Sequence, residues 1–204
     1  MLDFHTLKNS IIERFPNLSD EYFREDGTRL WVKAVLPQEF ITLFDFAVKE
    51  LRFDNFHMTV GLDSGDYFEI IYLLSNAENQ MLNLRQRTVS RDDTFAASVY
   101  PYFENALFHE RELIDLFGID VQGLPAGHRY PLPDKWPDDN YPLRKDWKTE
   151  FFDKKTLTYD HEDAAEAERL RLEEEARKKA AREAAIAAAK AKKAQQEKEA
   201  QANE

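Results

Sequence analysis

The stretch NFHMTVGLDSGDYFEIIYLLS, residues 55–75, decides the fold because it has the pattern of a β-hairpin. Its two arms, about Phe56 to Leu62 and Tyr67 to Leu74, are rich in residues that favour strands. The four residues between them, 63–66, read DSGD and are typical of a tight turn. QMLNLRQRTVS, residues 80–90, alternates more loosely and is expected to be a third strand. We therefore expect a small antiparallel or mixed sheet.

The residues before the hairpin predict two helices and one more strand. Residues 4–15 carry apolar side chains at helical spacing, and Pro16 ends that helix. Residues 28–36 alternate and favour a strand, after which Pro37 fits the first turn of a helix. The apolar face of this second helix is formed by Phe40, Leu43, Phe44, Ala47 and Leu51.

After the hairpin, two further helices are expected. Asp92 and Asp93 are suitable N-caps for a helix that begins near Thr94 and is interrupted by Pro101. Another helix is expected from about Phe103 to Phe117, with Gly118 as its C-terminal glycine. The fold class that follows is α+β, a small sheet packed with helices.

Residues 119–204 divide into two parts of different composition. Residues 119–160 show no period, and a loop of this length is usually functional or bound to a partner. Residues 162–204 are mostly Ala, Glu, Lys, Arg and Gln, with i,i+4 pairs such as Glu174–Lys178, which predicts a solvated, charged helix that Asp160 caps. We expect a domain over 1–118, an extended partner-clamping segment over 119–160 and a helical tail over 161–204.

Composition excludes several classes of function. The chain has no cysteine, so it offers no disulfide, thiolate nucleophile or cysteine-ligated cluster. Its net charge of −11 disfavours nucleic-acid binding. The tail from Glu162 onward has 11 acidic and 10 basic residues and so carries a net charge of only −1, which means that nearly all of the negative charge lies before the tail. We expect no membrane span and no secretory signal, and hence a cytoplasmic location.

The segment HERELIDLFGIDVQGLPAGHRYPLPDKWPDDNYPLRKDW, residues 109–147, combines many charges with prolines and aromatic residues. Glu112 and Asp115 lie one helical turn apart and need partners if they are covered. Arg129 and Arg144 are the expected partners for Glu110, Glu112 or Asp115, or for carboxylates of another protein, because guanidinium binds carboxylate in a bidentate fashion. A rigid, charge-paired segment of this kind is expected to lie along a neighbouring protein.

Two other classes of function stay open from the residues alone. One is a free-standing enzyme with a metal or an acid–base pair among His109, Glu112, Asp115 and His128. The other is a generic adaptor that acts through its charged tail. Nucleotide-binding glycine loops and a GxSxG elbow are absent from the sequence.

The segment resembles the family of the 30 kDa subunit of respiratory complex I and its relatives. The resemblance rests on HERELIDLFGI, GHRYPLP and YPLRKDW and covers roughly residues 1–150. The spacer LPDKWPDDNYPLRKD, residues 132–146, resembles energy-converting [NiFe] hydrogenases and formate hydrogenlyases, a branch that we expect ahead of an ordinary complex I.

The resemblance implies a subunit without a cofactor, in a peripheral position on the cytoplasmic side of the membrane. It implies that this subunit scaffolds the large subunit holding the [NiFe] or quinone site, alongside iron–sulfur subunits. The residues expected at the subunit interface are Glu110, Arg111, Glu112, Asp115, His128, Arg129, Pro142, Leu143, Arg144, Lys145 and Asp146.

Overall fold

The computed structural model describes residues 4–160, 162–174, 176–180 and 182, and divides into two compact units. The first unit extends to Trp147, and the second begins at Lys148. The described part of the chain contains no helix long and apolar enough to cross a membrane.

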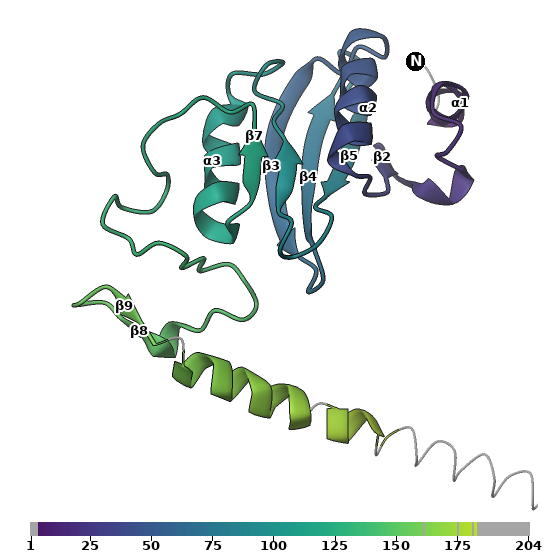
Figure 1. The fold of residues 1–204 in the computed structure, drawn as a ribbon. Coiled ribbons are helices and arrows are strands. Elements are labelled where there is room, and N and C mark those ends of the chain that lie inside the picture. The colour runs from purple at the N-terminus through teal and green to yellow at the C-terminus, as the bar shows by residue number, and fades with distance from the viewer. Residues whose placement is uncertain (1–3, 161, 175, 181, 183–204) are drawn as a thin grey trace, which may run out of the picture. The chain divides into compact units, whose positions relative to one another are not determined.

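A five-stranded sheet of order β1-β2-β5-β4-β3 forms the centre of the first unit (Figure 1). The pairs are antiparallel except for β2 with β5, which is parallel, so the sheet is mixed and the α+β expectation is confirmed. The strands are β1 (Phe23–Asp26), β2 (Arg29–Val32), β3 (Asn55–Asp63), β4 (Phe68–Ser75) and β5 (Met81–Arg87). The hairpin β3–β4 and its partner β5 match the sequence expectation.

Two of the described helices cover one face of this sheet, and a third, at the N-terminus, precedes them. Helix α1 (Phe4–Arg14) ends before Pro16, and α2 (Pro37–Lys49) begins at the expected proline. The rings of Phe40 and Phe44 on α2 contact Tyr72 of β4, at centroid distances of 4.9 and 5.8 Å. Helix α3 (Ala106–Phe117) packs on β3, where a side chain at Gly61 would collide with Phe117 and Leu113. The hydrophobic core therefore lies between the sheet and these helices.

The prediction of a helix that begins near Thr94 is wrong, because residues 95–97 form a strand. Strand β6 (Phe95–Ala97) pairs in parallel with β7 (Asp120–Gln122), and α3 connects the two. The backbone amides of Asp92 and Asp93 bond to the Ser90 side chain, which closes a turn in place of a helix start. A pairing partner more than twenty residues away outweighs the local capping signal.

The second unit holds a short 3₁₀ helix, a small hairpin and the start of the tail helix. The 3₁₀ helix η2 spans Thr149–Phe151, after which β8 (Phe152–Asp153) pairs with β9 (Thr158–Tyr159). Residues 162–174 and 176–180 are helical, and the Asp160 carboxylate accepts a bond from the amide of Asp163 at 3.1 Å, as a cap should. Glu174 and Lys178 form the expected ion pair at 2.7 Å. The tail expected beyond residue 182 lies outside the described residues.

Candidate functional site

Glu110, the first acidic residue of the ERE sequence, is buried inside this chain. It is 0% exposed, and its carboxylate accepts bonds from the Ser98 hydroxyl at 2.6 Å and the Val99 amide at 2.8 Å. Burial raises its pKa, although those two donors oppose the rise. Glu110 therefore ties α3 to the chain after β6, and its carboxylate is engaged within the fold.

The hairpin turn between β3 and β4 holds the end of the PLRKD sequence. The Asp63 carboxylate accepts bonds from the Arg91 guanidinium at 2.7 and 2.8 Å and from the Lys145 amide at 2.9 Å. Arg91 also pairs with Asp146. Burial alone would raise the pKa of Asp63, but these donors lower it below its ordinary value. Residues eighty positions apart are thereby joined, and the segment after Tyr141 is fixed to the sheet.

Gly118 is the point where helix α3 ends and the segment folds back over it. Its φ of +67° is the left-handed conformation that glycine adopts without strain. An added Cβ would lie 2.5 Å from the Tyr141 ring and 2.6 Å from the Arg144 guanidinium. That guanidinium stacks on Tyr141, 4.2 Å from the ring centroid, and its Nε donates to the Phe117 carbonyl at 2.7 Å. Burial lowers the pKa of Arg144.

Arg129 closes the loop between the two halves of the segment. Its guanidinium donates to the Trp136 carbonyl at 2.8 Å and pairs with Asp138 at 2.7 Å. Its observed carboxylate partner is therefore Asp138, and Arg144 bonds a helix-end carbonyl. Neither bond uses the α3 carboxylates that the sequence suggests as intrachain partners.

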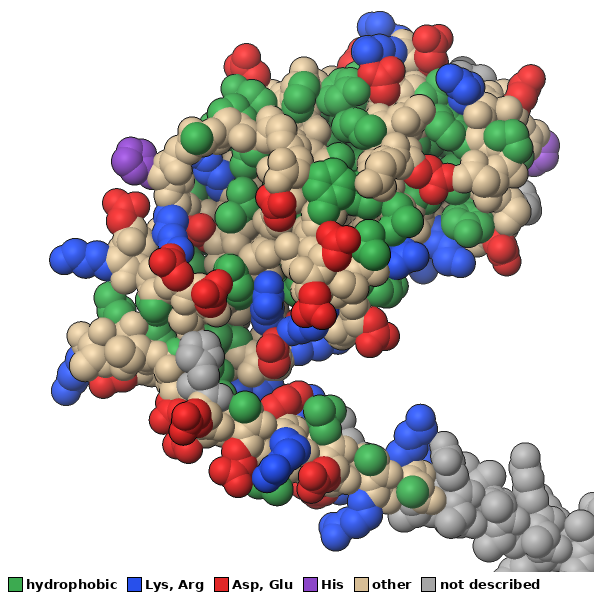
Figure 2. Space-filling view, viewed as in Figure 1, with side chains coloured by type: hydrophobic (Ala, Val, Ile, Leu, Met, Phe, Trp, Pro, Cys, Tyr) green, Lys and Arg blue, Asp and Glu red, His purple; other side chains and the backbone are tan. Residues whose placement is uncertain are grey.

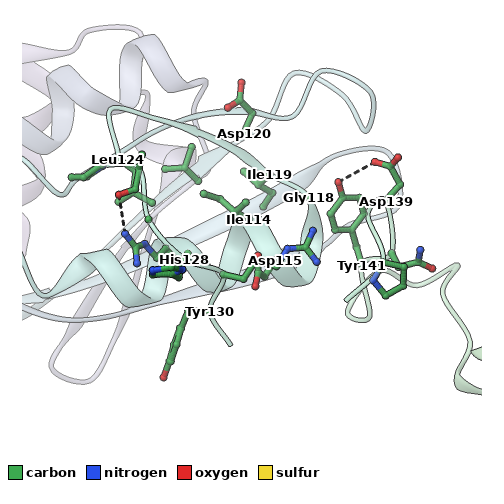
Figure 3. Close-up of a pocket in the computed structure, with 18 residues that line it drawn as sticks. Ile114, Asp115, Gly118, Ile119, Asp120, Leu124, His128, Tyr130, Asp139 and Tyr141 are labelled. Atoms are coloured by element: carbon green, nitrogen blue, oxygen red, sulfur yellow. Dashed lines mark hydrogen bonds between the residues drawn. The ribbon is translucent and has the colours of Figure 1, made fainter. Parts of the chain in front are cut away.

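A cavity of about 540 Å³ lies between the second half of α3 and this loop (Figure 3). Four of the sequence-predicted interface residues line it: Arg111, Asp115, His128 and Arg129. The Asp115 carboxylate accepts the Leu132 amide at 3.3 Å, and Arg111 bonds the Ala126 carbonyl at 3.4 Å. The cavity is lined by both signs of charge and by apolar side chains, so it is suited to a partner's side chain.

Several apolar side chains of α3 and of the segment after it are exposed, and two of them, Ile114 and Tyr130, line the cavity. Phe108 and Tyr130 are exposed and stack edge to face at 5.1 Å, and Ile114 is exposed on the same helix. Tyr130 points away from the other lining side chains in Figure 3. Leu143, which lies between the half-buried Pro142 and Arg144, is 52% exposed. Figure 2 shows acidic and apolar side chains interspersed over the first unit.

The four residues of the alternative metal or acid–base site do not all come together: Asp115 and His128 line the cavity, and neither His109 nor Glu112 lines it. The His109 ring packs against Phe56 at 5.8 Å, whereas His128 lies in the exposed loop. Glu112 is half-buried on α3, and no group of three His, Asp or Glu side chains with metal-binding geometry occurs in the described ranges.

Sequence reasoning misses the residues that hold the segment in place. The sequence predicts Asp63 only as a turn residue, and it does not single out Arg91 or Tyr141. The anchoring of Asp63 and Arg91 depends on contacts across more than fifty positions, for which a single sequence gives no signal. Phe108 could have been found, because it lies on α3 away from the buried positions Glu110, Leu113 and Phe117.

Comparison with known proteins gives the same family as the segment suggests. The family model "Respiratory-chain NADH dehydrogenase, 30 Kd subunit" matches residues 34–152, more than half of the chain. The C/D subunit of the NADH-quinone oxidoreductase of Chromohalobacter salexigens is 33% identical over 143 residues, which are 69% of this chain and 23% of that protein. The corresponding protein of Salmonella heidelberg is 32% identical over 112 residues, 55% of this chain and 18% of that protein.

The chain thus spans less than a quarter of the length of these curated relatives. A solved structure titled as the membrane-bound sulfane sulfur reductase, an archaeal respiratory membrane complex, is 21% identical with a TM-score of 0.49, covering 71% of this chain and 85% of that one. The match of the family model over most of the first unit shows that this chain belongs to the family of the respiratory-chain NADH dehydrogenase 30 Kd subunit.

Proposed function

We propose that this chain is a non-catalytic subunit of a membrane-bound oxidoreductase related to complex I. We further propose that residues 119–147, the part of the expected clamping segment 119–160 that belongs to the first unit, clamp the large subunit holding the quinone or [NiFe] site. The family consists of subunits of respiratory complexes, which supports a role in assembly. Without cysteine, the chain cannot ligate an iron–sulfur cluster through thiolates, so we assign the iron–sulfur clusters of such a complex to its partners. The partners proposed are the large subunit and the iron–sulfur subunits, and the place proposed is peripheral, on the cytoplasmic side of the membrane.

The observation that carries the proposal is the division of roles within the segment. Its charged side chains, such as Arg144 and Asp146, fix it to α3 and to the hairpin turn. Its apolar side chains, such as Leu143 and Tyr130, remain exposed. A rigid support that presents apolar groups loses little conformational entropy on binding, which favours a tight interface.

The test compares two leucines that are equally exposed. Leu143 on the clamp and Leu172 on the tail helix are each 52% exposed, so Leu143→Glu and Leu172→Glu make the same chemical change. Co-expressed with the other subunits, Leu143→Glu should reduce the recovered complex at least tenfold, about 1.4 kcal/mol at the interface. Leu172→Glu should leave it unchanged, and both free chains should keep their helicity.

The opposite pattern, with loss only for Leu172→Glu, would favour an adaptor that acts through its tail. Normal assembly of both variants would show that the clamp does not bind a partner. The large subunit recovered with the wild-type chain also decides the branch. The spacer at residues 132–146 favours the hydrogenase branch, whereas the matching curated relatives are NADH-quinone oxidoreductase subunits.

A further inference from the structure

The face of the five-stranded sheet that is turned away from the helices has a regular chemical pattern. Residues that stand opposite one another in paired strands share a face, and alternate residues of a strand point to opposite faces. Tyr72 of β4 contacts α2 and so belongs to the helix side. Its neighbours along β4, Ile71 and Leu73, therefore belong to the opposite, outer face.

The pairing registers define rows across this outer face. One row crosses all five strands through Arg24, Trp31, Asn83, Leu73 and Met58. The next row on one side contains Arg85, Ile71 and Val60, and the row beyond it contains Arg87, Glu69 and Leu62. The row on the other side contains Asp26, Arg29, Met81 and Ser75.

These rows divide the outer face into an aliphatic half and a basic half. The aliphatic half lies on β3 and β4 and consists of Met58, Val60, Leu62, Ile71 and Leu73. Met58 is 42% exposed and Leu62 43%, and the other three are half-buried. A sheet with apolar residues on a face ordinarily covers that face with another layer, and within the described first unit this half has no such layer.

The basic half lies on β1, β2 and β5. Its rows contain four arginines, Arg24, Arg29, Arg85 and Arg87, and only two carboxylates, those of Asp26 and Glu69. This excess of positive charge contrasts with the net charge of −11 of the whole chain. A shallow cleft of about 290 Å³ opens there, lined by Glu21, Tyr22, Phe23, Arg24, Trp31, Lys33 and Arg85. The Arg24 guanidinium lies 5.5 Å from the Trp31 ring and the Lys33 ammonium 4.7 Å from the Tyr22 ring, so each cation is supported by an aromatic face.

Two polar groups in the middle of this face have no hydrogen-bond partner among the described residues. Asn83 is 1% exposed, and neither the nitrogen nor the oxygen of its side-chain amide has a hydrogen-bond partner in the described part of the chain. The indole nitrogen of Trp31, which pairs with Asn83 across the strands, also has no hydrogen-bond partner in that part. Buried polar groups are ordinarily satisfied, and leaving them without a partner is costly. These atoms are already covered by the chain's own residues, so the contacts available to a partner are the exposed aliphatic side chains and the arginines around them.

We propose that this outer face is a second docking surface, distinct from the clamp, for a protein surface that is apolar in one part and carries carboxylates in the other. Charge complementarity specifies the occupant: the aliphatic half takes the apolar part, and the basic half and its cleft take carboxylates. A second copy of this chain, docked face to face, would offer the basic half either aliphatic side chains or further arginines, and few carboxylates.

The surface is tested in the native complex, purified through an affinity tag on the full-length chain. A photoreactive amino acid is placed at position 58 or 62, with position 143 on the clamp and position 36 beside α2 as references, and the linked peptides are identified by mass spectrometry. Positions 58 and 62 should link to a peptide of another subunit that contains Asp or Glu. In the chain labelled at position 58, Leu62→Glu and Arg87→Glu should each reduce that link at least tenfold, and the exposed Leu36→Glu should not.

Three outcomes would overturn the proposal. Links from 58 and 62 to this same chain would show that the face is covered by its own residues or by a second copy. Binding of the purified chain to vesicles containing an anionic phospholipid, lost in Leu62→Glu, would identify a lipid surface instead. Links from 143 but from neither 58 nor 62 would leave the clamp standing and refute the second surface alone, whereas a chain that purifies without partners would refute the clamp itself.

Discussion

Replacing Gly118 by alanine should destabilise the first unit through two separate effects. At φ +67°, an alanine costs about 1 kcal/mol because its Cβ approaches the backbone carbonyl. The same Cβ would lie 2.5 Å from the Tyr141 ring and 2.6 Å from the Arg144 guanidinium, which must move. Forcing an extra methyl into a packed site typically costs about 1–3 kcal/mol. The total expected loss is about 2–4 kcal/mol.

Gly27→Ala is the matched control for the conformational effect. Gly27 has φ +60° in the turn between β1 and β2, and nothing lies within 4 Å of its Cβ position. Gly27→Ala should therefore cost only about 1 kcal/mol. For a chain of this size each kcal/mol lowers the melting temperature by about 2–4 °C. Thermal unfolding of the full chain, followed by circular dichroism, measures both variants.

The collision is isolated by removing both side chains that cause it, the Tyr141 ring and the Arg144 guanidinium. The double variant Tyr141→Ala, Arg144→Ala should lose the stack and the bond to the Phe117 carbonyl. Gly118→Ala added to it should cost little more than Gly27→Ala, so that the changes are less than additive. Equal losses for Gly118→Ala and Gly27→Ala in the wild-type background would show that Tyr141 and Arg144 do not lie over the helix end. The account of how the segment is fixed would then be refuted.

Two further predictions concern the interior and the tail. Burial raises the pKa of Glu110 in the folded chain above its unfolded value of about 4.3. Between these two pKa values the folded chain keeps a proton that the unfolded chain has released. The stability that this proton contributes is therefore lost as the pH rises through that window. Glu110→Gln does not ionise, so its melting temperature relative to wild type should rise across pH 4–8, and a difference independent of pH would contradict the buried carboxylate. Deleting residues 162–204 should leave the melting temperature of the first unit nearly unchanged. The described tail side chains are mostly exposed, and surface ion pairs such as Glu174–Lys178 contribute little to the free energy of unfolding. A drop of many degrees would refute this prediction.

The parts of the fold that the sequence predicts are those set by local signals. Helix α2 follows from Pro37 and the spacing of Phe40, Phe44 and Ala47, all of which are buried. The β3–β4 hairpin follows from alternation around DSGD, and the end of α3 follows from Gly118. In each case the residues that decide the structure lie within a few positions of one another.

The parts that the sequence does not predict depend on distant partners. Strand β1, with the sequence FRED, is largely exposed and so shows no apolar alternation. Strand β6 exists because β7 pairs with it, and the parallel pairing of β2 with β5 joins segments about fifty residues apart. The segment after α3 is irregular over most of its length, as expected, but its anchors on Asp63 and Arg91 are not visible in one sequence.

The contacts of the segment change how an arginine variant is interpreted. From the sequence, Arg144→Ala is expected to weaken assembly while leaving the free chain folded. In the structure, the Arg144 guanidinium caps the end of α3 through the Phe117 carbonyl and stacks on Tyr141. Its removal must first loosen the segment itself, so reduced assembly would not by itself place Arg144 at an interface. Leu143 holds the segment only through its backbone, because its amide donates to the Leu116 carbonyl at 3.1 Å while its side chain is 52% exposed. A change of the Leu143 side chain keeps that bond, and for this reason the leucine, and not the arginine beside it, is the position that can separate binding from folding.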